Sequence, residues 1–383
     1  MLVTLASVTD ARLHLGSAVD MTRKNNFDFL RFAFASLVLV SHAWPLTTRP
    51  PVGDPLQRLT PAVISMGTLA VDGFFLMSGY LVAGSWMRTG RIVPYLRKRI
   101  LRIYPAFIVV TFAEAFILAP ALSAAIHPFP LKRQLALCFR GIVTLFGYDS
   151  WAGPFVAVPA NPFPRELAGT IWTIKYEFAC YLLVALLGSI GALRRPRLVL
   201  VLAAASLILY GSGLASHRAG SALAGGTWAQ FLAFFMVGSL VYSYRGKFRP
   251  SIVAALGAAV VVCVALLSPA ASRWCLPVFG GYLVFAAALV PSRLSTWGRY
   301  GDFSYGIYLW GFSIEQVLVH IRPDISPGAL IACAWPLTVI AGILSWFAIE
   351  KRFLSQKRVA EVEAAPTPDV AGAGETLTSP GLE

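Results

Sequence analysis

Long apolar segments follow one another through most of this chain and constrain its fold more than any other feature. A helix that crosses the hydrocarbon core of a bilayer needs about 20 such residues. Segments close to that length cover residues 27–46, 62–86, 101–120, 172–192, 197–216, 228–244, 251–268, 275–291, 302–321 and 328–350. Only 13% of the 383 residues are charged, roughly half the share usual in soluble domains. The sequence therefore predicts an all-α, polytopic membrane protein with about ten transmembrane helices.

The distribution of lysine and arginine predicts the orientation of these helices. An eleventh apolar segment, residues 134–148, is short for a span and carries Arg140 in its middle. If this segment does not cross and the N-terminus is cytoplasmic, 21 of the 32 lysines and arginines are cytoplasmic and nine lie outside. The positive-inside rule favours this arrangement. Both termini are then cytoplasmic, and residues 121–171 form a long outer segment between the third and fourth spans.

The two ends of the chain differ in composition from its middle. Residues 1–24 lack the apolar core of a signal peptide, and we expect a partly disordered cytoplasmic extension there. Residues 25–354 hold all the apolar segments and form the predicted transmembrane domain. Residues 355–383 have no aromatic side chain and are rich in Ala, Pro, Gly, Thr and Glu, so we expect a disordered cytoplasmic tail.

Net charge and cysteine content point to no further ligand class. The net charge of +14 follows from the positive-inside bias and gives no reason to expect a nucleic-acid partner. The five cysteines are scattered, without a CxxC motif or a Cys/His cluster. We therefore expect no metal site and no disulfide framework. The oligomeric state stays open, while membrane lipids are expected partners.

The first span contains two ionisable side chains whose transfer into lipid costs free energy, within the stretch RFAFASLVLVSH. His42 lies eleven positions after Arg31, which places both side chains on one helix face about 16 Å apart along the axis. Asp28 lies three residues before Arg31 and is its expected partner. Alternative interpretations are that Arg31 snorkels to the inner headgroups and that His42 is a packed histidine. Ionisable residues inside a membrane mark functional sites by default.

Further ionisable residues are expected inside the bilayer. Glu114, Glu177 and Glu315 lie at outer depths similar to that of His42, and Asp72 lies near mid-depth. If they converge, these residues line a polar cavity that opens to the outside. A histidine beside a carboxylate in such a cavity is suited to act as a general base. Each acid also has a structural interpretation as a hydrogen-bonding residue, which we favour for Glu114.

The cytoplasmic side carries a dense group of cations. Six lie within fifteen residues, namely Arg88, Arg91, Arg97, Lys98, Arg99 and Arg102. This number exceeds what topology requires, and guanidinium groups suit a polyanion such as a nucleotide or coenzyme A. The sequence has no Walker-type or GxGxxG loop, so we expect no ATP-driven work. An acyl group on a long pantetheine arm would connect this cationic mouth to the outer cavity.

Six segments in order resemble acyltransferase family 3, the O-acyltransferases of the bacterial inner membrane that modify surface polysaccharides. They are FDFLRFAFASLVLVSH, VDGFFLMSGYLVAG, YLRKRILRIYP, TIWTIKYEFACYLL, DFSYGIYLW and IEKRF. The resemblance extends over about residues 25–353. It implies that acyl-CoA, usually acetyl-CoA, binds from the cytoplasm. The acyl group then passes to a hydroxyl of a surface carbohydrate or glycolipid, such as lipopolysaccharide or exopolysaccharide, on the outer face.

The resemblance also implies roles for individual residues. His42 is the catalytic histidine by this resemblance, and we predict that Glu177 or Glu315 assists it. The predicted donor-binding residues are Arg31, Arg99, Arg102, Tyr305 and Tyr308. Asp28, Asp72 and Ser78 are predicted to be cavity or structural residues.

This sequence departs from the family pattern at two positions. Phe29 follows Asp28 where the family often has glycine, and Gly311 stands where many members have a second histidine. A role for a second histidine is therefore not expected. The alternative function is a proton-coupled transporter or flippase of a polysaccharide or a lipid-linked precursor, because ten spans with buried acids suit that class as well. A scaffold in a glycan assembly complex is a third interpretation.

Overall fold

The computed structural model describes residues 25–62, 64–122, 130–145, 158, 161–164, 166–214 and 224–354. These residues form helices and loops and contain no strand, which confirms the predicted all-α class for this part of the chain. The predicted extension (1–24) and tail (355–383) lie outside the described residues. So does much of the predicted outer segment (121–171).

The helices occupy the following bounds, in chain order. The first half contains α1 (Phe27–Thr47), α2 (Pro55–Leu59), α3 (Met66–Thr89), α4 (Ile92–Ala113), η1 (Glu114–Leu118), α5 (Ala119–Leu122), α6 (Leu131–Thr144), η3 (Ile171–Thr173) and α8 (Ile174–Ser189). The second half contains η4 (Ala192–Arg194), α9 (Pro196–Gly211), α11 (Ala224–Ser243), α12 (Ile252–Ala265), α13 (Pro269–Cys275), η5 (Leu276–Gly280), α14 (Gly281–Leu289), η6 (Arg293–Arg299), α15 (Ser304–Ile321), α16 (Pro327–Ser345) and η7 (Trp346–Glu350).

Six helical stretches in the described residues are long and apolar enough to cross a membrane. They are Phe27–Thr47, Met66–Thr89, Ile92–Leu122, Ile171–Ser189, Pro269–Leu289 and Pro327–Leu354. The other four predicted spans are also helical, as α9, α11, α12 and α15, but they are not among these six. The chain is therefore a multi-pass helical protein, while the number of about ten spans stays a prediction.

The helix that contains the third predicted span begins earlier than the hydropathy pattern indicates. The hydropathy pattern starts it at residue 101, whereas α4 begins at Ile92. Arg97, Lys98 and Arg99 lower the mean hydropathy of this first part, although arginine and lysine are good helix formers. Four of the six clustered cations are therefore on α4, whereas Arg88 is on α3 and Arg91 directly precedes α4.

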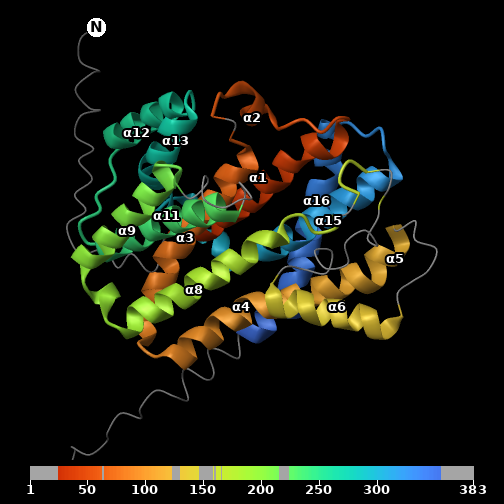
Figure 1. Ribbon diagram of the computed structural model, residues 1–383, viewed down its shortest axis with the longest axis horizontal. Coiled ribbons are helices and arrows are strands. Elements are labelled where there is room, and N and C mark those ends of the chain that lie inside the picture. The colour runs from red at the N-terminus through yellow and green to blue at the C-terminus, as the bar shows by residue number, and fades with distance from the viewer. Residues whose placement is uncertain are drawn as a thin grey trace, which may run out of the picture.

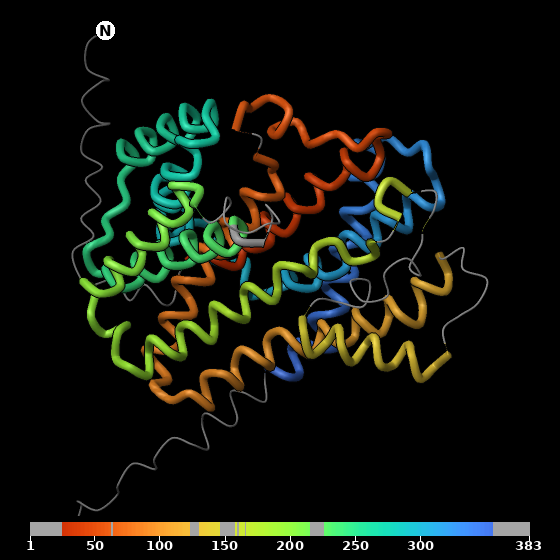
Figure 2. Tube along the Cα trace, in the orientation of Figure 1, coloured from red at the N-terminus to blue at the C-terminus, as the bar shows by residue number. Residues whose placement is uncertain are grey.

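The helices pack into one bundle (Figure 1). Helix α3 packs between α1 and α11, and α9 lies on the far side of α11. Helices α15 and α16 pack together against α1, while α4 lies beside α6 and α8. The trace in Figure 2 shows how the loop that carries α2 connects the end of α1 to the start of α3. Segments distant in sequence thus surround α1, which carries Arg31 and His42.

The outer surface of the bundle is apolar, as a lipid-facing surface must be. On α12, large apolar side chains are exposed at Val253, Leu256, Val260 and Val264. Their spacing of three and four residues forms one stripe along the helix. Soluble proteins rarely expose so continuous an apolar surface, so this stripe supports a membrane setting.

Two glycines bring α3 and α11 into close contact. A Cβ atom at Gly79 would meet the carbonyl oxygen of Phe235, and one at Gly238 would meet that of Leu76. Small residues allow two transmembrane backbones to approach in this way. Ser239 adds a hydrogen bond from its hydroxyl to the Gly79 carbonyl, at 3.1 Å. The relative position of α3 and α11 is therefore tightly fixed.

We expect Gly238→Ala to destabilise the protein by about 1–3 kcal/mol, because the added methyl forces the two backbones apart. The measurement is the thermal unfolding of the purified protein in detergent. Gly257→Ala on α12 is the matched control, since no atom lies within 4 Å of its Cβ position. Equal unfolding temperatures for the two variants would contradict the close contact between α3 and α11.

Candidate active site

A cavity of about 290 Å³ lies among α1, α3, α4, α8 and α15, and we call it the cationic cavity. Its polar and charged lining residues are Arg31, Ser78, Lys98, Arg99, Arg102, Thr173, Glu177, Tyr181, Asp302, Ser304, Tyr305 and Tyr308. All five residues predicted to bind the donor line this cavity, together with the predicted cavity residue Ser78. Four positive side chains in one enclosed space suit an anionic ligand.

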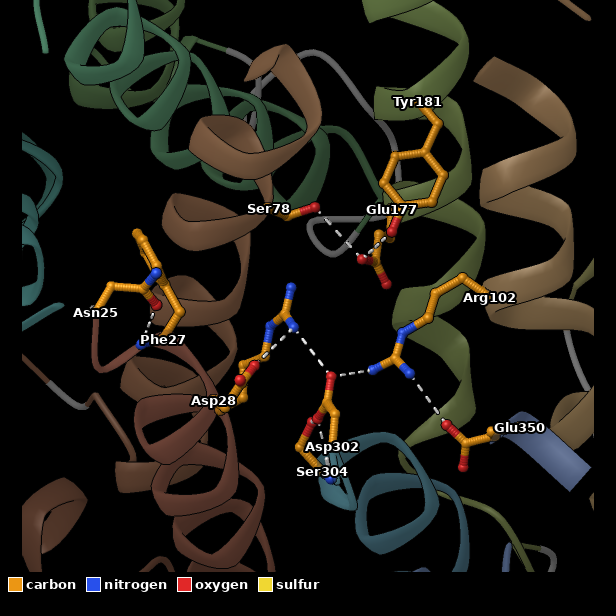
Figure 3. Close-up of polar contacts among 11 residues, drawn as sticks. Asn25, Phe27, Asp28, Ser78, Arg102, Glu177, Tyr181, Asp302, Ser304 and Glu350 are labelled. Atoms are coloured by element: carbon orange, nitrogen blue, oxygen red, sulfur yellow. Dashed lines mark hydrogen bonds and ion pairs between the residues drawn. The ribbon is translucent and has the colours of Figure 1, made fainter. Parts of the chain in front are cut away.

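A network of ion pairs holds two of these arginines (Figure 3). Asp302 Oδ2 accepts hydrogen bonds from Arg31 Nη1 at 2.9 Å and from Arg102 Nη2 at 2.6 Å. Arg102 Nη1 donates to Glu350 Oε2 at 3.1 Å. The predicted partner Asp28 is more distant, with 3.6 Å between its Oδ1 and Arg31 Nη1. The network ties α1, α4, the start of α15 and η7 together.

Asp302 lies in the loop before α15, at the centre of this network. Besides the two arginines, the backbone N–H and the hydroxyl of Ser304 donate to its Oδ1, and all these partners stabilise the ionised carboxylate. Asp302 is therefore ionised at neutral pH and neutralises part of the charge of Arg31 and Arg102.

Arg99 is held differently from the other two arginines. Its Nη2 donates to Ser85 Oγ at 3.1 Å, and its guanidinium lies 5.9 Å from the ring centroid of Tyr95 and 5.5 Å from that of Tyr181. Within the described residues none of these contacts is an ion pair. Arg99 is thus the arginine of the cationic cavity whose charge is available to a ligand.

Glu177 lies in the cationic cavity and not beside His42. Tyr181 donates a hydrogen bond of 2.5 Å to Glu177 Oε1, and Ser78 Oγ lies 3.4 Å from the same oxygen. Thr173 stands at the boundary between the two cavities, and Glu177 is one helical turn further along α8. Its predicted assistance to His42 therefore has no support in this arrangement.

A second cavity, of about 260 Å³, contains His42, and we call it the histidine cavity. Residues of α1, α2, α3, η3, α11 and α15 line it. Its polar and aromatic lining residues include Ser41, His42, Asp54, Gln57, Ser65, Thr68, Thr170, Trp172, Thr173, Thr227, Gln230 and Tyr308. Hydroxyl and amide groups dominate this list, so the cavity suits a neutral, hydrogen-bonding ligand.

Glu315 is the carboxylate that the structure brings to His42. Its Oε2 lies 3.5 Å from His42 Nδ1, and the side chain is fully buried. The ring of Phe312 packs edge-on against the imidazole, with 5.2 Å between ring centroids. A carboxylate at Nδ1 favours the tautomer that has its proton there. Nε2 is then the nitrogen that can accept a proton from a substrate.

The other two acids do not lie beside His42, and for Glu114 a structural role was the favoured interpretation. Glu114 is buried beside α15, where Ser313 Oγ lies 3.5 Å from its Oε1. Glu177 lies in the cationic cavity, as described above. The depth of each residue along its own helix could be predicted from the sequence, but the direction in which each helix face points could not.

Sequence reasoning missed three acids that organise the two cavities. Asp302 and Glu350 form the ion-pair network, and both stand within the family-like segments DFSYGIYLW and IEKRF. Asp54 accepts hydrogen bonds from Ser41 Oγ at 2.5 Å and from the backbone N–H of Met66 at 2.7 Å. It thereby fixes the loop of α2 beside the histidine cavity.

Among the described residues, no group of three His, Cys, Asp or Glu could hold a metal ion.

The two cavities meet at three shared lining residues, Val71, Thr173 and Tyr308. The Tyr308 hydroxyl lies 2.7 Å from Thr173 Oγ1 and donates to the Thr170 carbonyl at 2.8 Å. The ring of Phe74 packs against the Tyr308 ring, with 5.9 Å between centroids. A molecule that extends from one cavity into the other must pass between these side chains.

The structure thus has two adjoining cavities, one lined by four cations and the other by His42, inside a multi-pass helical protein. The chain belongs to acyltransferase family 3, because its residues 24–350 match the acyltransferase domain of that family. It is accordingly a membrane-embedded O-acyltransferase.

Three relatives are similar over different shares of the chain. The O-acetyl transferase of Shigella phage Sf6 is 26% identical over 349 residues, which cover 88% of this chain and 98% of that protein. The putative membrane-bound transacylase BcsY of Komagataeibacter xylinus is 24% identical over 89% of this chain and 86% of its own. Nodulation protein 10 of Rhizobium leguminosarum bv. viciae is 30% identical over 48% of this chain and 49% of its own. No solved structure matches the chain.

Proposed function

We propose that this enzyme transfers an acetyl group from cytoplasmic acetyl-CoA to a hydroxyl of a surface carbohydrate or glycolipid on the outer face of the bacterial inner membrane. The observation that carries the proposal is the contact between the cationic cavity and the histidine cavity at Val71, Thr173 and Tyr308. It allows one molecule to place its anionic part beside the arginines and its reactive end near His42.

Coenzyme A has the shape that these two cavities require. Its phosphates would lie near Arg99, whose contacts in the described residues leave its charge available. Guanidinium groups bind phosphate with paired hydrogen bonds, which lysine does not provide. The thin pantetheine arm would pass Tyr308 and carry the thioester toward His42. The predicted cytoplasmic position of the arginine-rich segment sets the side from which the donor enters.

His42 would act as the general base. Its Nε2 takes the proton of the acceptor hydroxyl while the hydroxyl oxygen attacks the thioester carbonyl carbon. The new C–O bond forms, the C–S bond breaks, and the sulfur of coenzyme A receives the proton from the imidazolium. Glu315 stabilises the positive charge that His42 carries between these steps. An acyl-histidine intermediate would use the same nitrogen.

The relatives support this choice of reaction. One is named an O-acetyl transferase and another a membrane-bound transacylase. A hydroxyl- and amide-lined histidine cavity suits a carbohydrate acceptor. A transporter or flippase, which is the alternative function considered from the sequence, would not use a thioester as a substrate.

Purified protein in proteoliposomes tests the proposal. We expect acetyl-CoA and a surface glycan fraction to yield free coenzyme A and an O-acetylated glycan, both detected by mass spectrometry. A strain without the gene should lack the same acetyl group on its surface glycans. Movement of the glycan across the bilayer without release of coenzyme A would contradict the proposal and favour transport.

A further inference from the structure

A buried polar pair lies behind the wall of the histidine cavity. Asp72, on α3, has only 2% of its surface exposed. The amide Nε2 of Gln230, on α11, donates to Asp72 Oδ1 at 2.9 Å and to Oδ2 at 3.1 Å. Gln230 itself lines the histidine cavity, whereas Asp72 does not. The carboxylate therefore acts on the cavity only through the amide.

The pair fixes which end of the amide Gln230 can offer to the cavity. Both oxygens of Asp72 accept from the amide nitrogen of Gln230, so the NH₂ end of the amide faces Asp72. The amide oxygen Oε1 is then the polar atom left for a ligand. The close contact of α3 and α11 at Gly79 and Gly238 keeps the two residues in register. Gln230 is thus presented to the cavity as a hydrogen-bond acceptor.

An acceptor atom at this place needs a donor from the substrate. The hydroxyl that undergoes acylation has one proton, and His42 takes it. A group that donates to Gln230 must therefore be a second hydroxyl or an N–H of the same molecule. The threonines and serines that line the same cavity provide further hydrogen-bonding groups. This chemistry is that of a polyhydroxylated ring and not of a simple alcohol.

We propose that Gln230, oriented by Asp72, binds a second hydroxyl of a polyhydroxylated acceptor and so positions the hydroxyl that reacts. This inference rests on the proposed function, because it assigns the acceptor side of the same reaction. Gln230 touches the acceptor, and Asp72 is a positioning residue that acts through Gln230. Water has no second hydroxyl, so hydrolysis of the thioester by water does not depend on the pair.

The test compares transfer with hydrolysis in three variants. The probe is the glycolipid and polysaccharide fraction extracted from a strain that lacks the gene, titrated against the full-length protein in proteoliposomes. We expect Gln230→Leu and Asp72→Asn to raise the acceptor KM about 3- to 10-fold, which corresponds to one hydrogen bond. The KM for the acceptor should rise more than the KM for acetyl-CoA, because Gln230 does not line the cationic cavity. Asp72→Asn leaves the amide of Gln230 free to turn, since asparagine both donates and accepts.

A double variant that exchanges the carboxylate and the amide between positions 72 and 230 is expected to restore acceptor binding. In the double variant Asp72→Asn with Gln230→Glu, the amide donates to the carboxylate, and a carboxylate oxygen remains for the acceptor. We expect its acceptor KM to return close to the wild-type value. Gln134→Leu is the matched control, because this buried glutamine donates to the Ala115 carbonyl and lines neither cavity.

The remaining outcomes overturn the inference in distinguishable ways. An unchanged acceptor KM in both single variants removes Gln230 from acceptor binding. An equal fall in transfer and in hydrolysis, with a lower unfolding temperature, makes the pair only a link between α3 and α11. If the wild-type protein releases no coenzyme A with or without acceptor, the proposed function itself fails, and this inference fails with it.

Discussion

Replacing His42 by alanine is expected to lower kcat/KM for acetyl transfer about 1,000-fold. General-base catalysis contributes roughly 10²- to 10⁴-fold, and among the described residues His42 is the only histidine that lines the histidine cavity. The KM for acetyl-CoA should change little, because the proposed binding site of the donor is the cationic cavity. Initial rates of coenzyme A release in proteoliposomes measure both quantities.

The carboxylate partner makes this prediction more specific. Glu315 lies 3.5 Å from His42 Nδ1 and acts only through the imidazole in our account. Residues that act as a unit have non-additive effects, so adding Glu315→Gln to His42→Ala should cause no further loss. His320→Ala is the matched control, because His320 is also on α15 but lines neither cavity. Retained transfer in His42→Ala would remove His42 from the mechanism.

Replacing Arg99 by glutamine is expected to raise the KM for acetyl-CoA about 10- to 100-fold with little change in kcat. A hydrogen bond to a charged group contributes about 1.5–3 kcal/mol, and 1.4 kcal/mol corresponds to a factor of ten. Arg99 has no ion-pair partner among the described residues, so its loss leaves no buried carboxylate unpaired. The fold should therefore be retained, which thermal unfolding checks.

Arg97→Gln is the matched control for this variant. Arg97 is on the same helix and has the same charge, but it is exposed and lines neither cavity. Equal KM values for the two variants would mean that Arg99 does not bind the donor. Arg102 is a poorer choice for this experiment, because its removal leaves Asp302 and Glu350 without their partner. Breaking a buried pair in this way destabilises a protein by about 3–5 kcal/mol.

The helical class and the positions of the helices could be predicted from the sequence, because hydropathy over some 20 residues is a strong local signal. The start of α4 could not, since Arg97 to Arg99 are helical and polar at once. The sequence also separated a cationic region from a histidine region. Arg31 and His42 are on one helix, so their spacing could be judged without knowledge of the packing.

The partners of these residues depend on packing between helices, which no local pattern encodes. Glu177 and Glu315 have similar predicted depths, yet only Glu315 lies beside His42. Asp302 is the first residue of the predicted span 302–321, and its position at the very end of that span gave no sign that it contacts two arginines. Gln230 is uncharged and was therefore not predicted to be a site residue, although its contact with Asp72 gives it a defined orientation. The predicted depth of each residue in the membrane therefore identified candidate site residues, but it did not show which of them contact each other.

The central claim is that the acetyl group crosses from one side of the membrane to the other through two adjoining cavities. Sealed proteoliposomes test it most directly, with acetyl-CoA bearing a labelled acetyl group inside and the glycan fraction outside. We expect labelled acetyl groups on the external glycan, while free coenzyme A stays in the lumen. If the glycan becomes labelled only when acetyl-CoA and the glycan are on the same side of the membrane, transfer across the membrane does not occur.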